Sequence, residues 1–319
     1  MTHSHPLSSA WPKVTTPLQP LAHPLFAQHG IAVWIKRDDL NHPSVQGNKW
    51  HKLKHNLQAA SAAGHTALLT FGGAYSNHIA ATAAAGEAFG LDTIGYIRGD
   101  ELAGKPERWS HTLRTAQQNG MQLQFLSRAD YRRKNDFHFL NQLTDKHPNA
   151  YILPEGGTNA LAVNGFAELS ETIERQCPDW THLYTAVGTG GTLAGLVKFA
   201  PRSRTRQLFG IATLNQADSL IGDIERLCGL PHQSGGTVQW RLLTHYAGAG
   251  YGRTSAEIQA TQHWFESQFQ LLLDPIYTAK LVFGFLQELQ AQKIPRGAKV
   301  VLYHSGGLQG RQTDAQTVI

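Results

Sequence analysis

The chain has 319 residues, of which 41% are hydrophobic and 16% are charged, and its formal net charge is +5. This length allows one large domain or two lobes of ordinary size. The densest basic run, Arg132-Arg133-Lys134, is typical of a solvated face, and no basic motif with interleaved aromatics occurs, so nucleic-acid binding is disfavoured. No apolar run approaches a membrane span.

The predicted elements begin with residues 1–30, which are rich in proline and histidine and are expected to be an irregular arm. A strand is expected at 33–36. A helix over 50–63 is predicted because apolar residues recur at helical spacing from Trp50 to Ala60. Strands and helices then alternate, with strands expected at 67–71, 93–97, 123–125 and 151–153 and helices at 76–89, 106–119 and 136–146.

The second half of the chain repeats this alternation of strands and helices. Such alternation predicts an α/β fold in which mostly parallel sheets are flanked by helices. Helices are expected at 160–176, 192–200, 254–269 and 278–292, and strands at 183–187, 207–213 and 299–303.

Lys49 follows Gly47 and Asn48, which suit a turn ahead of a helix. It would therefore lie in the first helical turn, where the partial positive charge of the helix end disfavours an ammonium. This setting favours a neutral amine, which can form a Schiff base with an aldehyde cofactor. The alternative is a solvated lysine at the start of a helix.

The loop Gly188-Thr189-Gly190-Gly191-Thr192 joins a predicted strand to a predicted helix. Such a passage gathers backbone N–H groups at a positive helix end and can hold a phosphate. It lacks the Gly-Lys-Ser/Thr of a Walker A loop. Leu193 occupies the third glycine position of a dinucleotide fingerprint. A small phosphate monoester therefore fits better than a nucleotide, and a tight turn without a ligand is the alternative.

Three other loops carry polar or aromatic residues at predicted element ends. Ser76 is expected to cap the helix after Gly72-Gly73, where backbone donors also suit a carboxylate. Tyr251 lies between glycines, where tyrosines either contact ligands or pack on the surface. The segment from Tyr303 to Gly307 follows a strand, at the edge where open α/β sheets bind ligands.

Other chemistries have little support in this sequence. Cys177 and Cys228 have no CxxC spacing and suggest buried thiols in a reducing cytosol. There is no HExxH, cysteine cluster or GxSxG elbow, so we expect no metal site. The N-terminus lacks a signal pattern. We expect a cytoplasmic protein without membrane or nucleic-acid partners.

Taken in order, these segments resemble the pyridoxal-phosphate enzymes grouped as 1-aminocyclopropane-1-carboxylate deaminase and D-cysteine desulfhydrase. The resemblance covers about residues 33–307, and the ordered set of motifs is more specific than any one of them. The matching segments are Trp34-Ile35-Lys36-Arg37-Asp38-Asp39-Leu40, Gly47-Asn48-Lys49, Gly72-Gly73, Ser76-Asn77-His78, Leu153-Pro154-Glu155-Gly156-Gly157, Gly188-Thr189-Gly190-Gly191-Thr192, Tyr246-Ala247-Gly248, Gly250-Tyr251-Gly252, Leu273-Asp274-Pro275-Ile276-Tyr277 and His304-Ser305-Gly306-Gly307.

The resemblance implies the two-lobed fold of the tryptophan-synthase β-like enzymes, in which each lobe is a mostly parallel sheet flanked by helices. Residues 1–49 and 156–319 would form a large lobe that binds pyridoxal 5'-phosphate, and 50–155 a small lobe. A small amino acid would be the substrate, and the protein would be a homodimer.

The resemblance also implies residue roles. Lys49 would hold the cofactor covalently, and Ser76, Tyr251 and Tyr277 would join it in catalysis. The cofactor would further contact Asn77 at its ring 3'-oxygen, Ser305 at its pyridine nitrogen, and Gly188, Thr189, Gly190, Gly191 and Thr192 at its phosphate. The substrate would contact Tyr75, Ser76, Asn77 and His78.

The reaction type follows from Thr278. Deaminases of this family place a glutamate there, whereas desulfhydrase-like members do not. With a neutral Ser305 hydroxyl at the pyridine nitrogen, the ring would be a weaker electron sink, which favours β-elimination with a good leaving group. Lys49 or Ser76 would remove the α-proton. D-Cysteine would give pyruvate, ammonium and sulfide. The alternatives are a 1-aminocyclopropane-1-carboxylate deaminase, a lyase for serine or cysteate, and a non-catalytic cofactor-binding protein.

The chain departs from the family pattern at three places. Tyr75 stands where glutamine is frequent, and Ala80 stands where arginine is common. The Gly-Asn segment usual after Arg98-Gly99 is absent from 100–115. Because Tyr75 adjoins the expected carboxylate site, the substrate is less well defined than the reaction.

Overall fold

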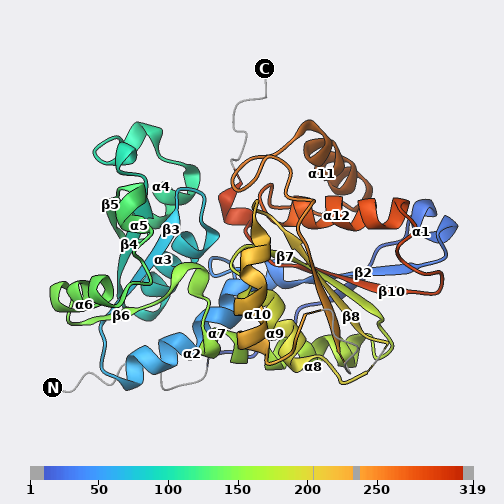
Figure 1. The fold of residues 1–319 in the computed structure, drawn as a ribbon, viewed down its shortest axis with the longest axis horizontal. Coiled ribbons are helices and arrows are strands. Elements are labelled where there is room, and N and C mark those ends of the chain that lie inside the picture. Colours follow the sequence, from blue (N-terminus) through green and yellow to red (C-terminus); the bar gives the residue numbers. More distant parts are fainter. Residues whose placement is uncertain (1–10, 204, 233–237, 312–319) are drawn as a thin grey trace. The chain divides into compact units, whose positions relative to one another are not determined.

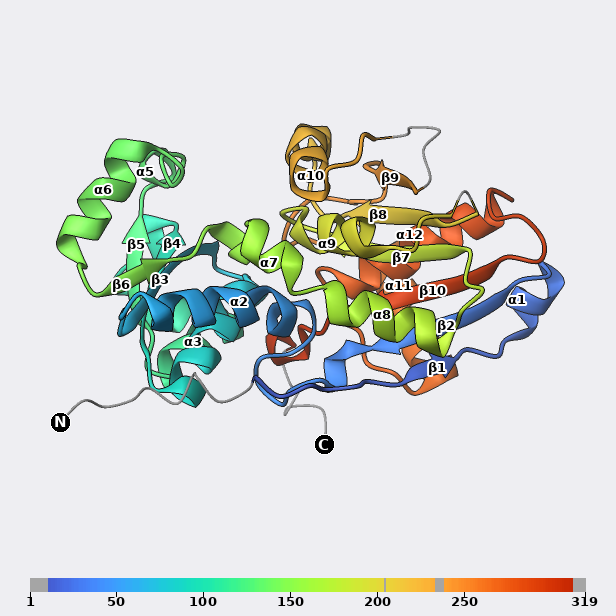
Figure 2. The same cartoon turned by 90° about the horizontal axis from the view of Figure 1, so that it is seen from below.

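The computed structural model describes residues 11–203, 205–232 and 238–311 (Figures 1 and 2). The chain forms two compact units. The large unit contains Pro12–Asn56 and Thr158–Gly306, and the small unit contains Leu57–Gly157 with the two chain ends. Helix α2 (Asn48–Ala62) begins in the large unit.

The large unit is built on a six-stranded sheet with the order β1-β2-β10-β7-β8-β9. All neighbouring strands are parallel except the edge strand β1, which is antiparallel to β2. A parallel sheet needs helical crossovers that cover both faces. The strands are β1 (Leu18–Pro20), β2 (Ala32–Arg37), β7 (His182–Val187), β8 (Gln207–Ala212), β9 (Gln239–Leu243) and β10 (Lys299–His304).

Successive side chains of these strands enter different cores, as the period of a strand requires. In β10, Val300 and Leu302 join one core, whereas Val301 and Tyr303 join the other. The first core lies under α1 (Pro24–Gln28), α11 (Ala256–Phe269) and α12 (Thr278–Gln290) (Figure 1). The second lies under α7 (Ala160–Asn164), α8 (Ala167–Gln176), α9 (Gly191–Phe199) and α10 (Ile221–Cys228).

The small unit is built on a four-stranded parallel sheet with the order β5-β4-β3-β6. Helices α3 and α4 pack on one face and α5 and α6 on the other. The strands are β3 (Ala67–Gly73), β4 (Asp92–Arg98), β5 (Gln122–Leu126) and β6 (Ala150–Ile152), and the helices are α3 (Asn77–Phe89), α4 (His111–Gln118), α5 (Arg128–Tyr131) and α6 (Phe137–Lys146).

The α/β class with mostly parallel sheets is confirmed, but three expectations for single elements were wrong. The arm at 1–30 contains β1 and α1 in its described part. The helix expected at 106–119 begins only at His111, because Pro106 opens a separate 3₁₀ turn and Ser110 caps the helix. The helix expected at 160–176 is split into α7 and α8 near Gly165.

Candidate active site

Gly47 fixes the position of the segment that leads into Lys49. Its φ is +65°, and a Cβ there would lie 1.8 Å from the carbonyl oxygen of Ser305. Only glycine therefore lets this backbone approach the end of β10 so closely. The amide of Asn48 donates to the same carbonyl at 3.2 Å. Lys49 follows as the second residue of α2, in the first turn as predicted.

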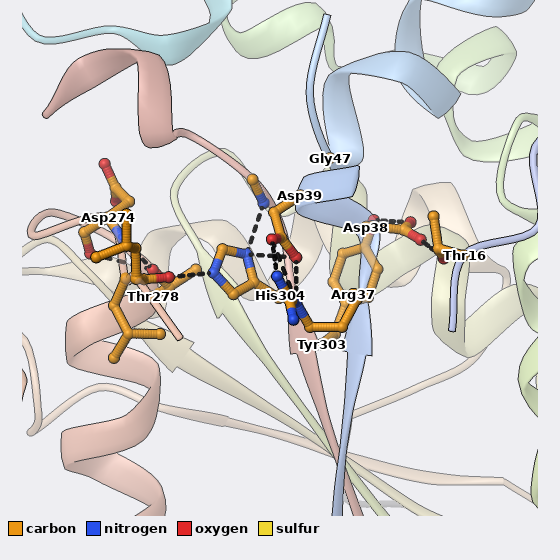
Figure 3. A network of polar contacts seen from close by, with 12 residues as sticks. Thr16, Arg37, Asp38, Asp39, Gly47, Asp274, Thr278, Tyr303 and His304 are labelled. Carbon is orange, nitrogen blue, oxygen red and sulfur yellow. Dashed lines mark hydrogen bonds and ion pairs between the residues drawn. The ribbon is translucent and has the colours of Figure 1, made fainter. Parts of the chain in front are cut away.

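The charged corner Arg37-Asp38-Asp39, which precedes Gly47, supports this segment through hydrogen bonds. The backbone N–H of Gly47 donates to the carbonyl oxygen of Asp38 at 2.9 Å. The Asp38 carboxylate in turn accepts a hydrogen bond from the Tyr303 hydroxyl at 2.8 Å (Figure 3). It also contacts Nε2 of His51 at 2.8 Å. Burial alone would raise the pKa of Asp38, but the hydrogen bond and charge of His51 and the charge of Lys36 outweigh it and lower the pKa.

A second acid, Asp39, holds the other side of the corner. Its carboxylate accepts three hydrogen bonds from the Arg37 guanidinium, at 2.9, 3.2 and 2.7 Å. His304 lies beside it, with Nδ1 3.6 Å from an Asp39 oxygen (Figure 3). Because Nδ1 of His304 accepts the N–H of Gly306 at 3.2 Å, Nε2 carries the proton donated to the Leu272 carbonyl oxygen at 2.8 Å. The turn after β10 is thus fixed from both sides.

Lys49 is half-buried, and its pKa is lowered to about 8. Burial is the main cause, and the Asp274 carboxylate opposes it. The sequence predicted this direction from the helix end, whereas loss of solvation accounts for most of it. Lys36 and Lys280 also have pKa values of about 8, so the lowered pKa alone does not single out Lys49.

The hydrogen bonds of the three lysines distinguish them. Nζ of Lys280 donates to the carbonyl oxygens of Thr213 and Gly250, at 3.0 and 2.7 Å. Nζ of Lys36 is likewise held by a backbone carbonyl. Nζ of Lys49, in contrast, donates to the Asn48 side chain at 3.1 Å. Of these three lysines, Lys49 is therefore the one whose amine is bonded to a side chain and not to a backbone carbonyl, which agrees with its predicted role.

The glycine loop lies beside this lysine segment. Strand β7 ends at Val187, and Gly190, with φ +82°, precedes α9. The Asn48 side chain donates to the Thr192 hydroxyl at 2.8 Å, which links the residue before Lys49 to the start of α9. The loop predicted as Gly188–Thr192 is therefore brought together with Lys49 in one unit.

Sequence reasoning missed Lys52, which lies one helical turn after Lys49. Its Nζ donates to the Thr158 hydroxyl at 3.0 Å and lies 3.1 Å from where a Cβ of Gly191 would be. Burial and the positive charge of Lys49 hold its pKa well below the usual value. A buried amine beside a loop of backbone amides suits a phosphate dianion. The i, i+3 spacing from Lys49 was the signal in the sequence.

The two predicted tyrosines lie together in the large unit. The ring centroids of Tyr251 and Tyr277 are 6.3 Å apart, with an interplanar angle of 67°. The Tyr277 ring lies 3.1 Å from where a Cβ of Gly188 would be. A side-chain oxygen of Asp274 accepts the N–H of Tyr277 at 2.6 Å and so orients the start of α12.

Four predicted site residues, Tyr75 to His78, lie in the small unit. Ser76 caps α3, as expected, by accepting the N–H of Ile79 at 3.4 Å. Asn77 begins the helix and is buried, whereas Tyr75 is 50% exposed. His78 is only 2% exposed, and its Nε2 contacts the Thr70 hydroxyl at 2.8 Å. His78 therefore ties α3 to β3, and its contact with substrate stays a prediction.

Comparison with known proteins decides the family. A family described as "Pyridoxal-phosphate dependent enzyme" matches residues 13–306. This chain belongs to that family. It is 27% identical to a putative 1-aminocyclopropane-1-carboxylate deaminase of Pyrococcus furiosus, over 95% of this chain and 94% of that protein. It is 26% identical to the bifunctional D-cysteine desulfhydrase/1-aminocyclopropane-1-carboxylate deaminase, mitochondrial, of Arabidopsis thaliana, over 88% of this chain and 74% of that protein.

The solved structures show the same relationship. The crystal structure of an ACC deaminase homologue has a TM-score of 0.76 with this chain and 26% sequence identity. It covers 93% of this chain, and 91% of that structure is matched. The family and the pyridoxal-phosphate cofactor expected from the sequence are therefore both confirmed.

The described residues fit this cofactor. Pyridoxal phosphate carries an aldehyde, for which Lys49 provides an amine with a lowered pKa. It also carries a phosphate, to which the backbone N–H groups of Gly188 to Thr192 and the amine of Lys52 would donate hydrogen bonds. Ser305, 8% exposed, follows directly after β10. When bound, the cofactor withdraws electrons from the α-carbon of an attached amino acid.

No helix among the described residues is both long and apolar enough to span a membrane. No group of three or more histidine, cysteine or acidic side chains is placed to hold a metal ion in the same part of the chain.

Proposed function

We propose that this enzyme is a lyase that catalyses β-elimination on a small 3-substituted amino acid, with D-cysteine giving pyruvate, ammonium and sulfide. The observation that carries the choice of reaction is the environment of Thr278. Its hydroxyl accepts the N–H of Asp274 at 2.6 Å and donates to the Asp274 carbonyl at 3.1 Å. The position offers no carboxylate to the pyridine nitrogen, and the Arabidopsis relative is named for both activities.

The residues would act as follows. Nζ of Lys49, neutral above about pH 8, or Oγ of Ser76 would take the α-proton. Ser76 and the backbone N–H groups at the start of α3 would hold the substrate carboxylate. The hydroxyl of Tyr251 or Tyr277 would give a proton to the leaving sulfur. Asn77 would contact the ring oxygen of the cofactor, and Ser305 its pyridine nitrogen.

Pyruvate release from a panel of D- and L-amino acids tests the proposal, with Lys49→Ala as the control for turnover. We expect D-cysteine to be the best substrate, with sulfide and pyruvate formed in equal amounts. Turnover of aminocyclopropane carboxylate without turnover of D-cysteine would favour the deaminase instead. Cofactor binding with no turnover of any substrate would favour a non-catalytic binding protein.

We also propose a division into a cofactor-binding lobe, 1–49 with 156–319, and a small lobe, 50–155. The two compact units support it in part, since they divide after Asn56 and after Gly157, whereas Trp11 and the segment that begins at Gly307 belong to the small unit. Homodimeric assembly and a cytoplasmic location complete the proposal. The location is supported by Cys177 and Cys228, which are buried free thiols. Light scattering of the purified protein and cell fractionation test these two points.

A further inference from the structure

The small unit contains a pocket that the proposed reaction does not use. Its volume is about 500 Å³. It opens at the carboxyl edge of the sheet, since Arg98 is the last residue of β4 and Arg128 begins α5 just after β5. The residues that line it are Arg98, Arg128, Tyr131, Arg132, Lys134 and Glu155.

The charges of this pocket are not balanced. Four of its lining side chains are cationic and one is a carboxylate. Glu155 already accepts the Tyr131 hydroxyl at 2.7 Å and pairs with Lys134 at 3.4 Å. Among the described residues, the guanidinium groups of Arg98 and Arg132 form no ion pair. Two guanidinium groups are therefore available to an anion.

The buried ring of Tyr131 gathers these cations. Nζ of Lys134 stands 5.3 Å from the ring centroid, and Cζ of Arg98 stands 5.9 Å from it. Contacts of cations with an aromatic face are favourable at such distances. Lys134 and Arg98 thus lie over the same aromatic ring, which offsets part of the repulsion between their charges.

Arg132 and Arg133 are exposed, as expected for a solvated face, but the residues of the basic run at 132–134 differ in their surroundings. Arg132 and Lys134 line the pocket, whereas Arg133 does not. Arg133 instead lies 3.9 Å from the Asp136 carboxylate and over the Phe139 ring. The chain thus supplies a neighbouring arginine of equal charge that lies outside the pocket.

We propose that this pocket binds a small anion with two or more negatively charged phosphate-type groups. Guanidinium groups match such groups because their planar fork donates two parallel hydrogen bonds. The volume is that of a small-molecule site. A pocket around one tyrosine fits a compact ligand better than a nucleic acid, which needs an extended basic surface. Gly73 is the register partner of Arg98, so the bound anion lies beside the strand end that leads to Ser76.

Calorimetric titration of the pyridoxal-phosphate-loaded enzyme with inorganic pyrophosphate tests this proposal. The loaded enzyme is required because its glycine loop is then occupied. We expect one saturable site for pyrophosphate. The double variant Arg98→Gln with Arg132→Gln should raise the Kd of this site by about tenfold or more. Arg133→Gln, which removes one arginine charge outside the pocket and so matches the single variant Arg132→Gln, leaves Kd within about twofold.

Several results would overturn the proposal. These are the absence of saturable binding to the wild-type enzyme, an equal loss of affinity in Arg133→Gln, and tighter binding of a single-stranded oligonucleotide that depends on the same arginines. The cofactor absorption band reports whether each variant is folded. Should the double variant not fold, the exposed single change Arg132→Gln still has to weaken pyrophosphate binding more than Arg133→Gln does.

Discussion

Replacement of Gly47 by alanine tests how Lys49 is held. The new Cβ would lie 1.8 Å from the carbonyl oxygen of Ser305, 2.1 Å from its carbonyl carbon and 2.5 Å from the nitrogen of Gly306. All three atoms are backbone, so no side-chain rotation relieves the contact. Either the turn after β10 or the segment before Lys49 has to move.

The cost has two parts. A positive φ costs a non-glycine residue about 1–2 kcal/mol. Displacement of packed backbone adds about 1–3 kcal/mol, by analogy with overpacked cores. Gly229→Ala isolates the first part, because Gly229 has φ +73° and nothing lies within 4 Å of its Cβ position. We expect Gly47→Ala to lower the free energy of unfolding by about 1–3 kcal/mol more than Gly229→Ala.

Urea unfolding of both variants measures this difference. Borohydride reduction followed by peptide mass analysis measures how much cofactor becomes attached to Lys49. We expect Gly47→Ala to reduce attachment and Gly229→Ala to leave it unchanged. Equal destabilisation by the two substitutions, with full attachment in both, would refute the inference that the contact with Ser305 positions Lys49.

Three more results follow from lysines with lowered pKa values. Because the pKa of Lys49 is near 8, the rate at which pyridoxal phosphate attaches to it in the cofactor-free protein should rise with pH by up to about tenfold per pH unit below pH 8 and stay constant above pH 8. A rate independent of pH between 6.5 and 8 would contradict this. Lys52→Met should weaken cofactor affinity by about tenfold or more, as measured by absorbance titration, whereas Lys54→Met should not, since Lys54 pairs with Glu168 at 2.8 Å. Lys280 has a pKa of about 8 in the folded protein and an ordinary value of 10.5, so between pH 8 and 10 the unfolded chain binds more protons and the free energy of unfolding rises with pH. Lys280→Met should reduce the slope of this rise by at most about 1.4 kcal/mol per pH unit. An unchanged slope in urea unfolding would count against the lowered pKa.

The fold was predictable where local pattern and burial agree. Buried strands such as 183–187 and 299–303 are nearly continuous apolar runs between turn residues, and the structure places both inside the large sheet. The break after α7 depends on a tertiary contact. A Cβ at Gly165 would lie 2.0 Å from the carbonyl oxygen of His51. No periodicity within 160–176 reveals that approach.

The candidate site was predictable to a similar degree. The sequence identified Lys49 and the glycine loop from their positions at element ends, and the structure links them through Asn48 and Thr192. No role for Asp38 followed from the sequence, because its carboxylate supports the site through contacts with Tyr303 and His51, and these two residues approach it only in the folded chain. Lys52 was missed since its neighbour Thr158 is distant in sequence.

The contact between Gly47 and the turn after β10 has a consequence for biosynthesis. The strand β2, which precedes Lys49, leaves the ribosome before its neighbour β10 and the carbonyl of Ser305, because these lie near the end of the described residues. Lys49 therefore acquires its supported position only after residue 305 has been translated. Cofactor loading at this lysine should thus be a late event that follows synthesis of nearly the whole described chain.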